Sequence, residues 1–233
     1  MAIQTFLAMT AEEIHRCSVF PETVGWMSCH FSSYSSGLTN LPQQLVPGSL
    51  LILDDSTPIA GHDPQQVAAQ LSECVCRTQC CGILLDLQRD YTEEAAAMAK
   101  HLSVSLPCPV AVSAGFAAAL DGPVFLPPLP HHLPLADHIA PWKGREIWLE
   151  LALDGETIQL TESGSTLEAL PPESVFPSGH REDKLNCHYQ IECFDHHALF
   201  TLWRTKEDLE NLLREADGLG ITTAVGLYQE LGE

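Results

Sequence analysis

Two polar side chains follow an apolar run near the middle of the sequence. Residues 81–90 read Cys-Gly-Ile-Leu-Leu-Asp-Leu-Gln-Arg-Asp between two amphipathic helical segments, which predicts a buried parallel strand with a polar end. Because alternate residues of a strand share a face, Asp86 and Gln88 point to the same side. An acid and an amide at the carboxyl end of a strand occupy the usual place of a barrel enzyme's active site. The alternative is that both side chains only hydrogen-bond the following helix.

Other carboxylates also end predicted strands or hairpins. They are Asp54, Asp55, Glu150, Glu192 and Glu230. Paired carboxylates carry out most glycoside hydrolysis, one as an acid and the other as a base or nucleophile. The candidate catalytic residues are therefore Asp86, Glu150 and Glu192. The chain holds 31 acidic residues, so the opposing interpretation is that some of them reach such a site by chance.

Strand-like and helix-like segments alternate along most of the chain, which favours an α/β fold with parallel strands. The predicted strands are Gln4–Met9, Val24–Phe31, Ser49–Asp54, Gly82–Gln88, Pro109–Ala114, Pro123–Leu126, Glu146–Leu153 and Thr223–Gln229. Between them, Asp63, Thr92 and Thr205 are predicted to cap helices with apolar stripes. Eight strands are the number that a closed (β/α)8 TIM-type barrel needs, and 233 residues suffice for one such domain over 1–233.

One region breaks this alternation. Residues 154–203 carry the pattern of β-hairpins, with a turn signal at Asp154-Gly155 and a proline-rich stretch at Pro171–Gly179. We therefore predict a β-rich insertion before the last barrel strand.

The polar strand resembles the D-x-x-D-x-D-x-E strand of glycoside hydrolase family 18, the chitinase-like barrels. Asp86 takes the last aspartate of that motif and Gln88 takes the catalytic glutamate. The resemblance covers about residues 49–233. It includes the predicted insertion, because family 18 barrels carry an α+β insertion at the same connection, between the last two barrel strands. The end of the chain, residues 224–232, is similar to the closing strand G-x-G-x-W-x-L-G of the spore-associated and peptidoglycan-directed branches, with Tyr228 in place of the tryptophan.

The chain departs from the family pattern at several polar positions. Cys81 and Leu84 replace the first two aspartates, and Phe125–Pro128 stands where a Tyr-Asp pair is expected. In the family the glutamate protonates the glycosidic oxygen and the preceding aspartate orients the acetamido group. An amide cannot protonate a leaving group, and general acid catalysis contributes about 10²–10⁴-fold. The resemblance therefore implies the fold of a glycosidase with an impaired active site.

Two classes of function remain open. The first is a binding protein that holds a glycan or another small ligand at the strand ends. Its expected ligand-binding residues are Asp86, Gln88, Trp26, Trp148 and Tyr228. The second is an active glycoside hydrolase that uses a different carboxylate pair, with Glu150 or Glu192 as the acid. A carboxyl group within about 3 Å of a scissile oxygen would separate the two.

Charge restricts the possible partners. The chain has 11 Lys and Arg against 31 Asp and Glu, a formal charge of −20. Such a surface repels phosphate backbones, so we expect neither nucleic acid nor anionic membranes as partners. No segment has the length and apolarity of a membrane span, and residues 1–10 lack the features of a secretory signal. The sequence does not indicate the oligomeric state.

The nine cysteines favour a reduced, cytoplasmic protein without structural disulfides, because the number is odd and several cysteines lie in apolar runs. The Cys74–Cys81 segment lacks the paired C-x-x-C spacing of a zinc site. His131-His132 with Asp137-His138, and Asp195-His196-His197, could bind a metal, but the second group resembles a hairpin tip, where exposed histidines are ordinary. We therefore expect no metal. We also expect no cofactor, since the chain has no P-loop or dinucleotide-binding motif.

Overall fold

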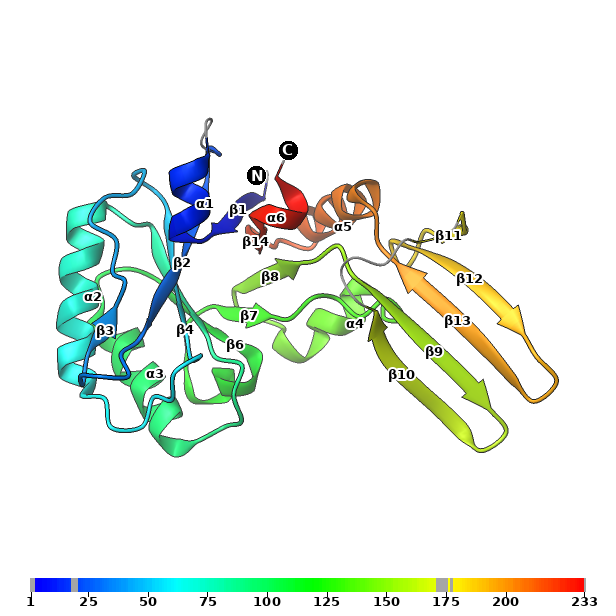
Figure 1. Cartoon of the computed structure of the whole chain (residues 1–233), viewed down its shortest axis with the longest axis horizontal. Coiled ribbons are helices and arrows are strands. Elements are labelled where there is room, and N and C mark those ends of the chain that lie inside the picture. The colour runs from blue at the N-terminus through cyan, green and yellow to red at the C-terminus, as the bar shows by residue number, and fades with distance from the viewer. Residues whose placement is uncertain (1–2, 18–20, 171–175, 177, 233) are drawn as a thin grey trace.

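The protein is built around a closed ring of eight parallel strands (Figure 1). The computed structural model describes residues 3–17, 21–170, 176 and 178–232. In ring order the strands are β1 (Gln4–Met9), β2 (Val24–Phe31), β4 (Leu50–Asp54), β5 (Gly82–Asp86), β6 (Val110–Ser113), β7 (Val124–Leu126), β8 (Ile147–Leu151) and β14 (Thr223–Leu227). β1 pairs with both β14 and β2, which closes the ring. This confirms the predicted TIM-type barrel.

Helices follow most strands, and three of them begin at the caps that the sequence predicted. The helices are α1 (Ala11–Arg16), α2 (Pro64–Thr78), α3 (Glu93–Ser105), η1 (Ala114–Ala119), α4 (Leu135–Ile139), η2 (Ala140–Trp142), α5 (Lys206–Gly218) and α6 (Tyr228–Leu231). Asp63, Thr92 and Thr205 each accept a hydrogen bond from a backbone N–H of the first helical turn, which satisfies a donor that would otherwise have no partner. The connection from β2 to β4 is fully described and holds only the short strand β3 (Leu38–Thr39) instead of a helix.

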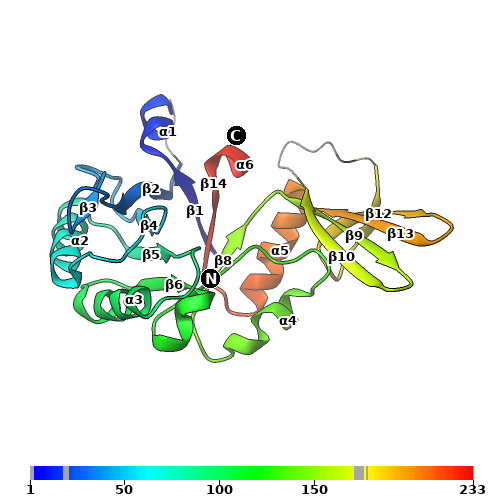
Figure 2. The same cartoon turned by 60° about the horizontal axis from the view of Figure 1, so that its bottom comes forward.

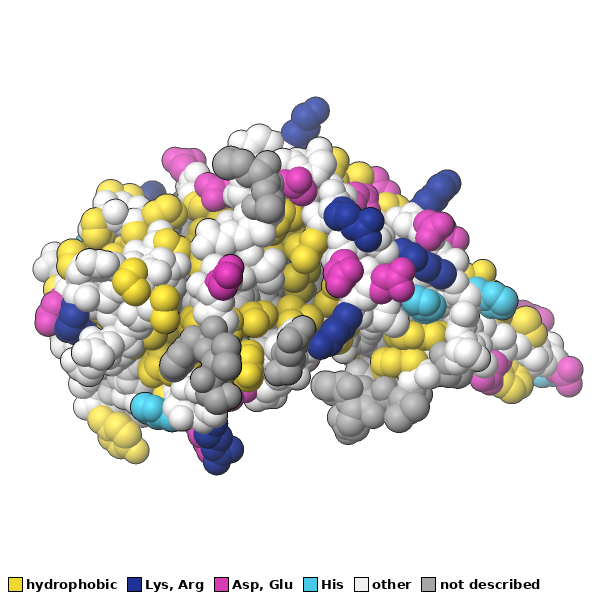
Figure 3. All heavy atoms as spheres, turned by 90° about the horizontal axis from the view of Figure 1, so that it is seen from above, with side chains coloured by type: hydrophobic (Ala, Val, Ile, Leu, Met, Phe, Trp, Pro, Cys, Tyr) yellow, Lys and Arg dark blue, Asp and Glu magenta, His cyan; other side chains and the backbone are white. Residues whose placement is uncertain are grey.

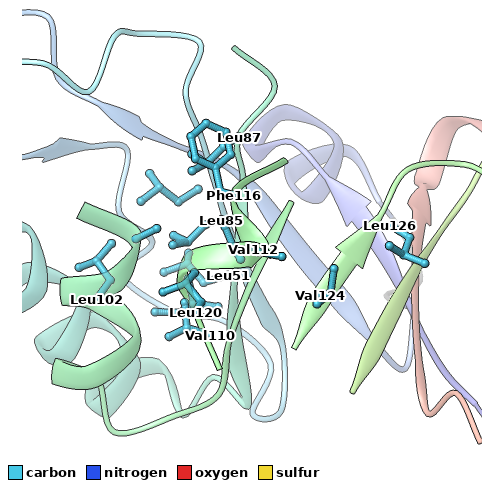
Figure 4. Packing of buried hydrophobic residues seen from close by; sticks show 14 of the residues in the cluster. Leu51, Leu85, Leu87, Leu102, Val110, Val112, Phe116, Leu120, Val124 and Leu126 are labelled. Atoms are coloured by element: carbon cyan, nitrogen blue, oxygen red, sulfur yellow. The ribbon is translucent and has the colours of Figure 1, made fainter. Parts of the chain in front are cut away.

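The hydrophobic core has two layers separated by the strands. Inside the ring, the apolar cluster consists of Phe6, Ala8, Leu50, Ile52, Leu84, Ala111, Phe125, Trp148 and Val225. Outside it, Leu51 of β4 and Leu85 of β5 pack with Leu102 of α3 (Figure 4). All three of these leucines are almost fully buried, and burial of one such side chain stabilises the fold by about 1.5–3 kcal/mol. Alternate apolar residues of each strand thus point into the ring and outward to the helices, so that the same strands contribute to both layers.

A β-rich insertion lies between β8 and β14, as predicted. Its strands are β9 (Gly155–Thr161), β10 (Gly164–Leu170), β11 (His180–Glu182), β12 (Cys187–Cys193) and β13 (His197–Trp203). They form an antiparallel sheet in the order β10-β9-β13-β12-β11, and its two long hairpins project beyond the barrel and its helices (Figures 1 and 2). Most of the proline-rich stretch 171–179 lies outside the described residues.

One buried arginine joins the insertion to the barrel. The side chain of Arg204, 4% exposed, directly follows β13. Its guanidinium donates to the backbone carbonyl of Leu129 after β7 and, over 3.2 Å, to that of Asn186 before β12. A third bond, of 3.3 Å, goes to the carbonyl of Pro130. Since the guanidinium fork reaches carbonyls of both parts at once, it sets the position of the insertion relative to the barrel.

Candidate functional site

A row of polar side chains follows the carboxyl ends of three neighbouring strands. His30 on β2 is register-paired with Asp54 on β4, and Asp54 with Asp86 on β5. Ile52 and Leu84, two residues earlier on β4 and β5, belong to the barrel interior. Strand alternation therefore turns Asp54 and Asp86 inward at the mouth of the barrel. Nδ1 of His30 lies 2.7 Å from Oδ2 of Asp54, so these two side chains form a hydrogen-bonded pair.

Asp86 accepts hydrogen bonds from two neighbours. Nε2 of Gln88 donates to its Oδ2 over 3.1 Å, and the hydroxyl of Ser113 on β6 donates to its Oδ1 over 3.5 Å. Burial raises the pKa of Asp86, and the negative charges of Asp54 and Asp55 raise it further, while the two hydrogen bonds act in the opposite direction. The net effect is that Asp86 keeps its proton to a higher pH than an exposed aspartate.

The position of Gln88 depends on a second, fully buried carboxylate. Asp55, 4% exposed, accepts the backbone N–H groups of Gln88 and Arg89, each over 3.0 Å. Nε of Arg89 in turn donates to the carbonyl of Asp55 over 2.6 Å. These bonds take residues 88 and 89 out of the strand ladder and hold the loop after β5. The side chain of Gln88 is thereby held beside Asp86 at the mouth.

Glu150 on β8 faces the mouth of the barrel, as Asp86 does. Burial raises its pKa from an ordinary 4.5 to about 7, and the negative charges of Asp86, Asp154 and Glu230 add to the effect. A carboxyl group with such a pKa exchanges its proton near neutral pH, which is what a general acid or base requires.

A cavity of about 420 Å³ at the mouth brings Asp86, Gln88, Ser113 and Glu150 together. It is lined by Asp86, Leu87, Gln88, Ser113, Ala114, Gly115, Phe125, Pro127, Pro128 and Glu150. A smaller cavity of about 50 Å³ at the centre of the barrel shares Asp86, Phe125 and Glu150 with it. Apolar walls with a few convergent polar groups are typical of small-molecule sites. The groups present can accept and donate hydrogen bonds, and Glu150 can transfer a proton.

The two tryptophans proposed from sequence do not line this cavity. Trp148 lies on the same face of β8 as Glu150 but one layer deeper, where it is 5% exposed and its indole N–H donates to Glu146 over 2.9 Å. Trp26 lies on the outer face of β2, and its indole N–H donates to the carbonyl of Asn40 over 3.2 Å. It lines a separate groove of about 780 Å³ between α1 and residues 40–46.

Tyr228 and Glu192 also lie outside the mouth cavity. Tyr228 begins α6 instead of ending β14, and its hydroxyl lies 3.7 Å from Sγ of Cys17, directly after α1. Glu192 is exposed on β12 of the insertion, near the far end of a hairpin that points away from the barrel (Figure 1). Of the residues proposed from sequence, the structure brings together Asp86, Gln88 and Glu150.

Sequence reasoning missed His30 and Ser113. Ser113 lies two residues after Ala111, which points into the barrel, and directly precedes the predicted end of its strand. Strand alternation could therefore have placed Ser113 at the mouth. His30 was hidden by a β-bulge, because the register of β2 against β4 shifts between Trp26 and Cys29. Simple alternation would turn Cys29 inward, whereas the bulge sends it to the outer core and turns His30 to the mouth.

In the part of the chain that the structure describes, no group of three His, Cys, Asp or Glu side chains is arranged to hold a metal ion. None of the described helices has the length and apolarity needed to cross a membrane.

Comparisons with known proteins show similarity of fold. No protein-family model and no curated protein matches the sequence. Among solved structures, a chitinase from Chromobacterium violaceum covers 100% of this chain and 95% of its own, with a TM-score of 0.61 and 9% identity. A glycoside hydrolase family 18 N-acetylglucosaminidase from Paenibacillus barengoltzii covers 97% and 94%, with a TM-score of 0.61 and 10% identity. The spore cortex-lytic enzyme SleL of Bacillus cereus covers 99% and 71%, with a TM-score of 0.60 and 8% identity. The chain therefore has a chitinase-like, glycoside hydrolase-like barrel fold.

Proposed function

We propose that this protein binds a glycan or another small polar ligand in the mouth cavity and does not cleave chitin-like substrates. The observation that carries the proposal is the hydrogen bond of 3.1 Å from the amide of Gln88 to the carboxylate of Asp86. In the resemblance to family 18, Gln88 stands where the proton-donating glutamate is expected. A carboxamide has no titratable proton to give to a leaving group, but it hydrogen-bonds a sugar hydroxyl well.

The surroundings of this pair support binding without catalysis. Leu84 lies directly below Asp86 in the barrel interior, and Phe125 lines the cavity from β7. Both positions are polar in the family pattern, where they set the pKa of the acid and hold the acetamido group. Pro127 and Pro128 complete an apolar wall, against which one face of a sugar ring can pack. The glycosidase names of several structural neighbours make a glycan the first ligand to test.

A specific observation also favours a second candidate function, a glycoside hydrolase with an unusual acid. The pKa of Glu150 is raised to about 7, and Glu150 lines the same cavity as Asp86. A protonated glutamate and an ionised aspartate are the pair that such hydrolysis requires. In this alternative Glu150 donates the proton and Asp86 stabilises or attacks the sugar.

Binding and turnover measured on the same protein separate the two functions. Isothermal titration calorimetry with chitin oligosaccharides and with muropeptide fragments measures binding, and a fluorogenic chitin oligosaccharide measures cleavage. We expect binding without appreciable turnover, and Asp86→Asn should weaken binding about tenfold through loss of a charge-assisted hydrogen bond. Glu192→Gln, on the exposed hairpin, is the matched control and should leave binding unchanged. Absence of binding to any of these ligands would contradict the proposal, and brisk turnover that Glu150→Gln abolishes would establish the alternative.

A further inference from the structure

The insertion sheet has one face that is strongly apolar. In antiparallel strands, directly opposed residues place their side chains on the same face. The register pairs Leu167 of β10 with Ile158 of β9, Ile158 with Phe200 of β13, and Phe200 with Ile191 of β12. Four large apolar side chains thus form a continuous row across four strands.

A second row lies next to the first on the same face. Leu160 of β9 is paired with Ala198 of β13, and Ala198 with Cys193 of β12. We call the surface formed by Ile158, Leu160, Leu167, Ile191 and Phe200 the apolar face of the insertion.

The opposite face of the same strands is mostly polar. Its first row is Thr166, Gln159, Leu199 and Glu192, and its second row is Glu168, Thr157, Thr201 and Gln190. The sheet therefore has the one-sided pattern of an antiparallel sheet that covers something with its apolar face and meets water with the other.

The apolar face is nevertheless open to solvent in the single chain. The side chains of Leu167, Ile191 and Leu160 are 54%, 45% and 42% exposed. The hairpins that carry them extend beyond the barrel and its helices (Figures 1 and 2). A contiguous exposed apolar patch on a soluble domain marks an interaction surface far more often than isolated exposed side chains do.

Charge limits what can cover this face. Among the side chains that β9, β10, β12 and β13 turn to the apolar face of the insertion, Glu156 is the only charged one. It is buried near the start of β9, where its carboxylate accepts a hydrogen bond of 2.8 Å from Nδ1 of His132. A basic partner would find no exposed acid there. An anionic membrane would be repelled by a chain of charge −20, several of whose acidic side chains lie on the face shown in Figure 3. The occupant must therefore be apolar and uncharged where it makes contact.

We propose that a second copy of this chain covers the apolar face, so that two insertions pack face to face about a two-fold axis. A two-fold axis places the same uncharged row on both sides of the contact, which makes the surface self-complementary. Four strands about 4.8 Å apart and seven residues long offer roughly 19 by 24 Å per copy. The two copies together bury on the order of 1,000 Å², the lower limit for a specific interface. The dimer is thus concentration-dependent.

The test uses the full chain and two pairs of neighbouring substitutions. Sedimentation velocity and light scattering from micromolar to submillimolar concentration should show a reversible monomer–dimer equilibrium. Leu167→Glu and Ile191→Glu each place a charge on the apolar face at an exposed position, so the fold is kept while the dimer is lost. Thr166→Glu and Gln190→Glu place the same charge on the opposite face of the same strands and should leave the dimer intact. Circular dichroism and the thermal midpoint verify folding of all four variants.

Four results would overturn the proposal. The first is a wild-type chain that stays monomeric at every concentration. The second is a dimer that persists in both Leu167→Glu and Ile191→Glu. The third is a dimer that Thr166→Glu weakens as much as Leu167→Glu does, which would indicate pairing along the free edge of β10 instead of packing between faces. Binding of the monomer to uncharged phosphatidylcholine vesicles, lost in Leu167→Glu, would assign the face to a lipid surface and also overturn it.

Discussion

The amide of Gln88 and the carboxylate of Asp86 form a donor–acceptor pair 3.1 Å apart at the barrel mouth. The contact depends on Asp55, which accepts the backbone N–H of Gln88 after β5 has ended at Asp86. The amide stabilises the ionised form of Asp86 and opposes the effect of burial on its pKa. A glutamate at position 88 would instead place two carboxyl groups at the same separation.

We predict that Gln88→Glu does not restore a chitinase. Two carboxyl groups about 3 Å apart cannot both ionise, so the pair would share one proton and one pKa would rise strongly. An intact site would gain up to about 10²–10⁴-fold from a general acid, but Leu84 and Phe125 provide no polar support for it. We expect a gain far below that range in a fluorogenic chitin oligosaccharide assay.

Gln190→Glu is the matched control for this substitution. Nε2 of Gln190 lies 3.5 Å from Oε1 of Glu192, two residues further along the same exposed strand. The control creates an equivalent acidic pair away from the cavity and should not alter turnover. A gain of 10²-fold or more in Gln88→Glu alone would contradict the prediction and show that the cavity supports general acid catalysis.

Glu150 should make the stability of the protein fall as the pH rises from about 4.5 to about 7. The folded chain holds this proton up to a pKa of about 7, whereas the unfolded chain releases it near 4.5. Below pH 4.5 Glu150 is protonated in both states and does not change the free energy of unfolding. Above pH 7 the buried charge of Glu150 lowers the free energy of unfolding by on the order of 3 kcal/mol. Glu150→Gln removes that cost.

Urea unfolding at pH 4.5 and pH 8 measures the effect. The free energy of unfolding of Glu150→Gln should exceed that of wild type at pH 8 and match it at pH 4.5. Glu192→Gln, an exposed glutamate, should match wild type at both pH values. An equal gain at both pH values for Glu150→Gln would mean that packing, and not the charge, is responsible.

Much of the barrel could be predicted because alternation and capping are local signals. The bounds of β1 and β2 agree with the prediction, and Asp63, Thr92 and Thr205 cap helices as expected. The predicted strand ending at Gln88 stops at Asp86, since Asp55, thirty-odd residues earlier in the sequence, takes the backbone N–H groups that would continue the ladder. Such a distant contact leaves no local trace.

The candidate site could be predicted only where strand ends alone decide. Asp86 and Glu150 follow from the positions of their strands. Trp148 lies two residues before Glu150 on β8, and its side chain is therefore in the closed interior instead of the mouth cavity. Tyr228 lies outside the cavity because β14 ends at Leu227 and α6 begins at Tyr228. That turn is possible because Gly226 has no Cβ, which would overlap Leu231.

Thiol reactivity should divide the nine cysteines by exposure. All nine lie in the described part of the chain and none of them forms a disulfide there, and three of them, Cys76, Cys81 and Cys193, are exposed. Burial raises the pKa of Cys29 and raises that of Cys187 to about 11, so these thiols have little reactive thiolate. A disulfide-exchange reagent should label Cys76 and Cys193 rapidly in the native protein, and Cys81 more slowly, because burial also raises the pKa of the Cys81 thiol.

The same reagent tests the expected reduced state when the chain is unfolded without reductant. Close to nine thiols should then react, and six or fewer would contradict a reduced cytoplasmic protein. Rapid reaction of Cys29 in the native state, identified by mass spectrometry, would contradict the buried outer core around it.

Arg204→Met should destabilise the protein and loosen the insertion in particular. The substitution keeps the apolar stem but removes the donors to the carbonyls of Leu129, Pro130 and Asn186, which then lie buried without that partner. Unsatisfied buried groups of this kind cost about 1–3 kcal/mol each before relaxation, so we expect a total loss of about 2–5 kcal/mol in urea unfolding. Hydrogen exchange should rise more in β9 and β13 than in β4 and β5, because the arginine joins the insertion to the barrel.

Arg214→Met, at an exposed position of α5, is the control and should cost less than about 0.5 kcal/mol. Equal exchange in the two sheets would mean that other contacts position the insertion.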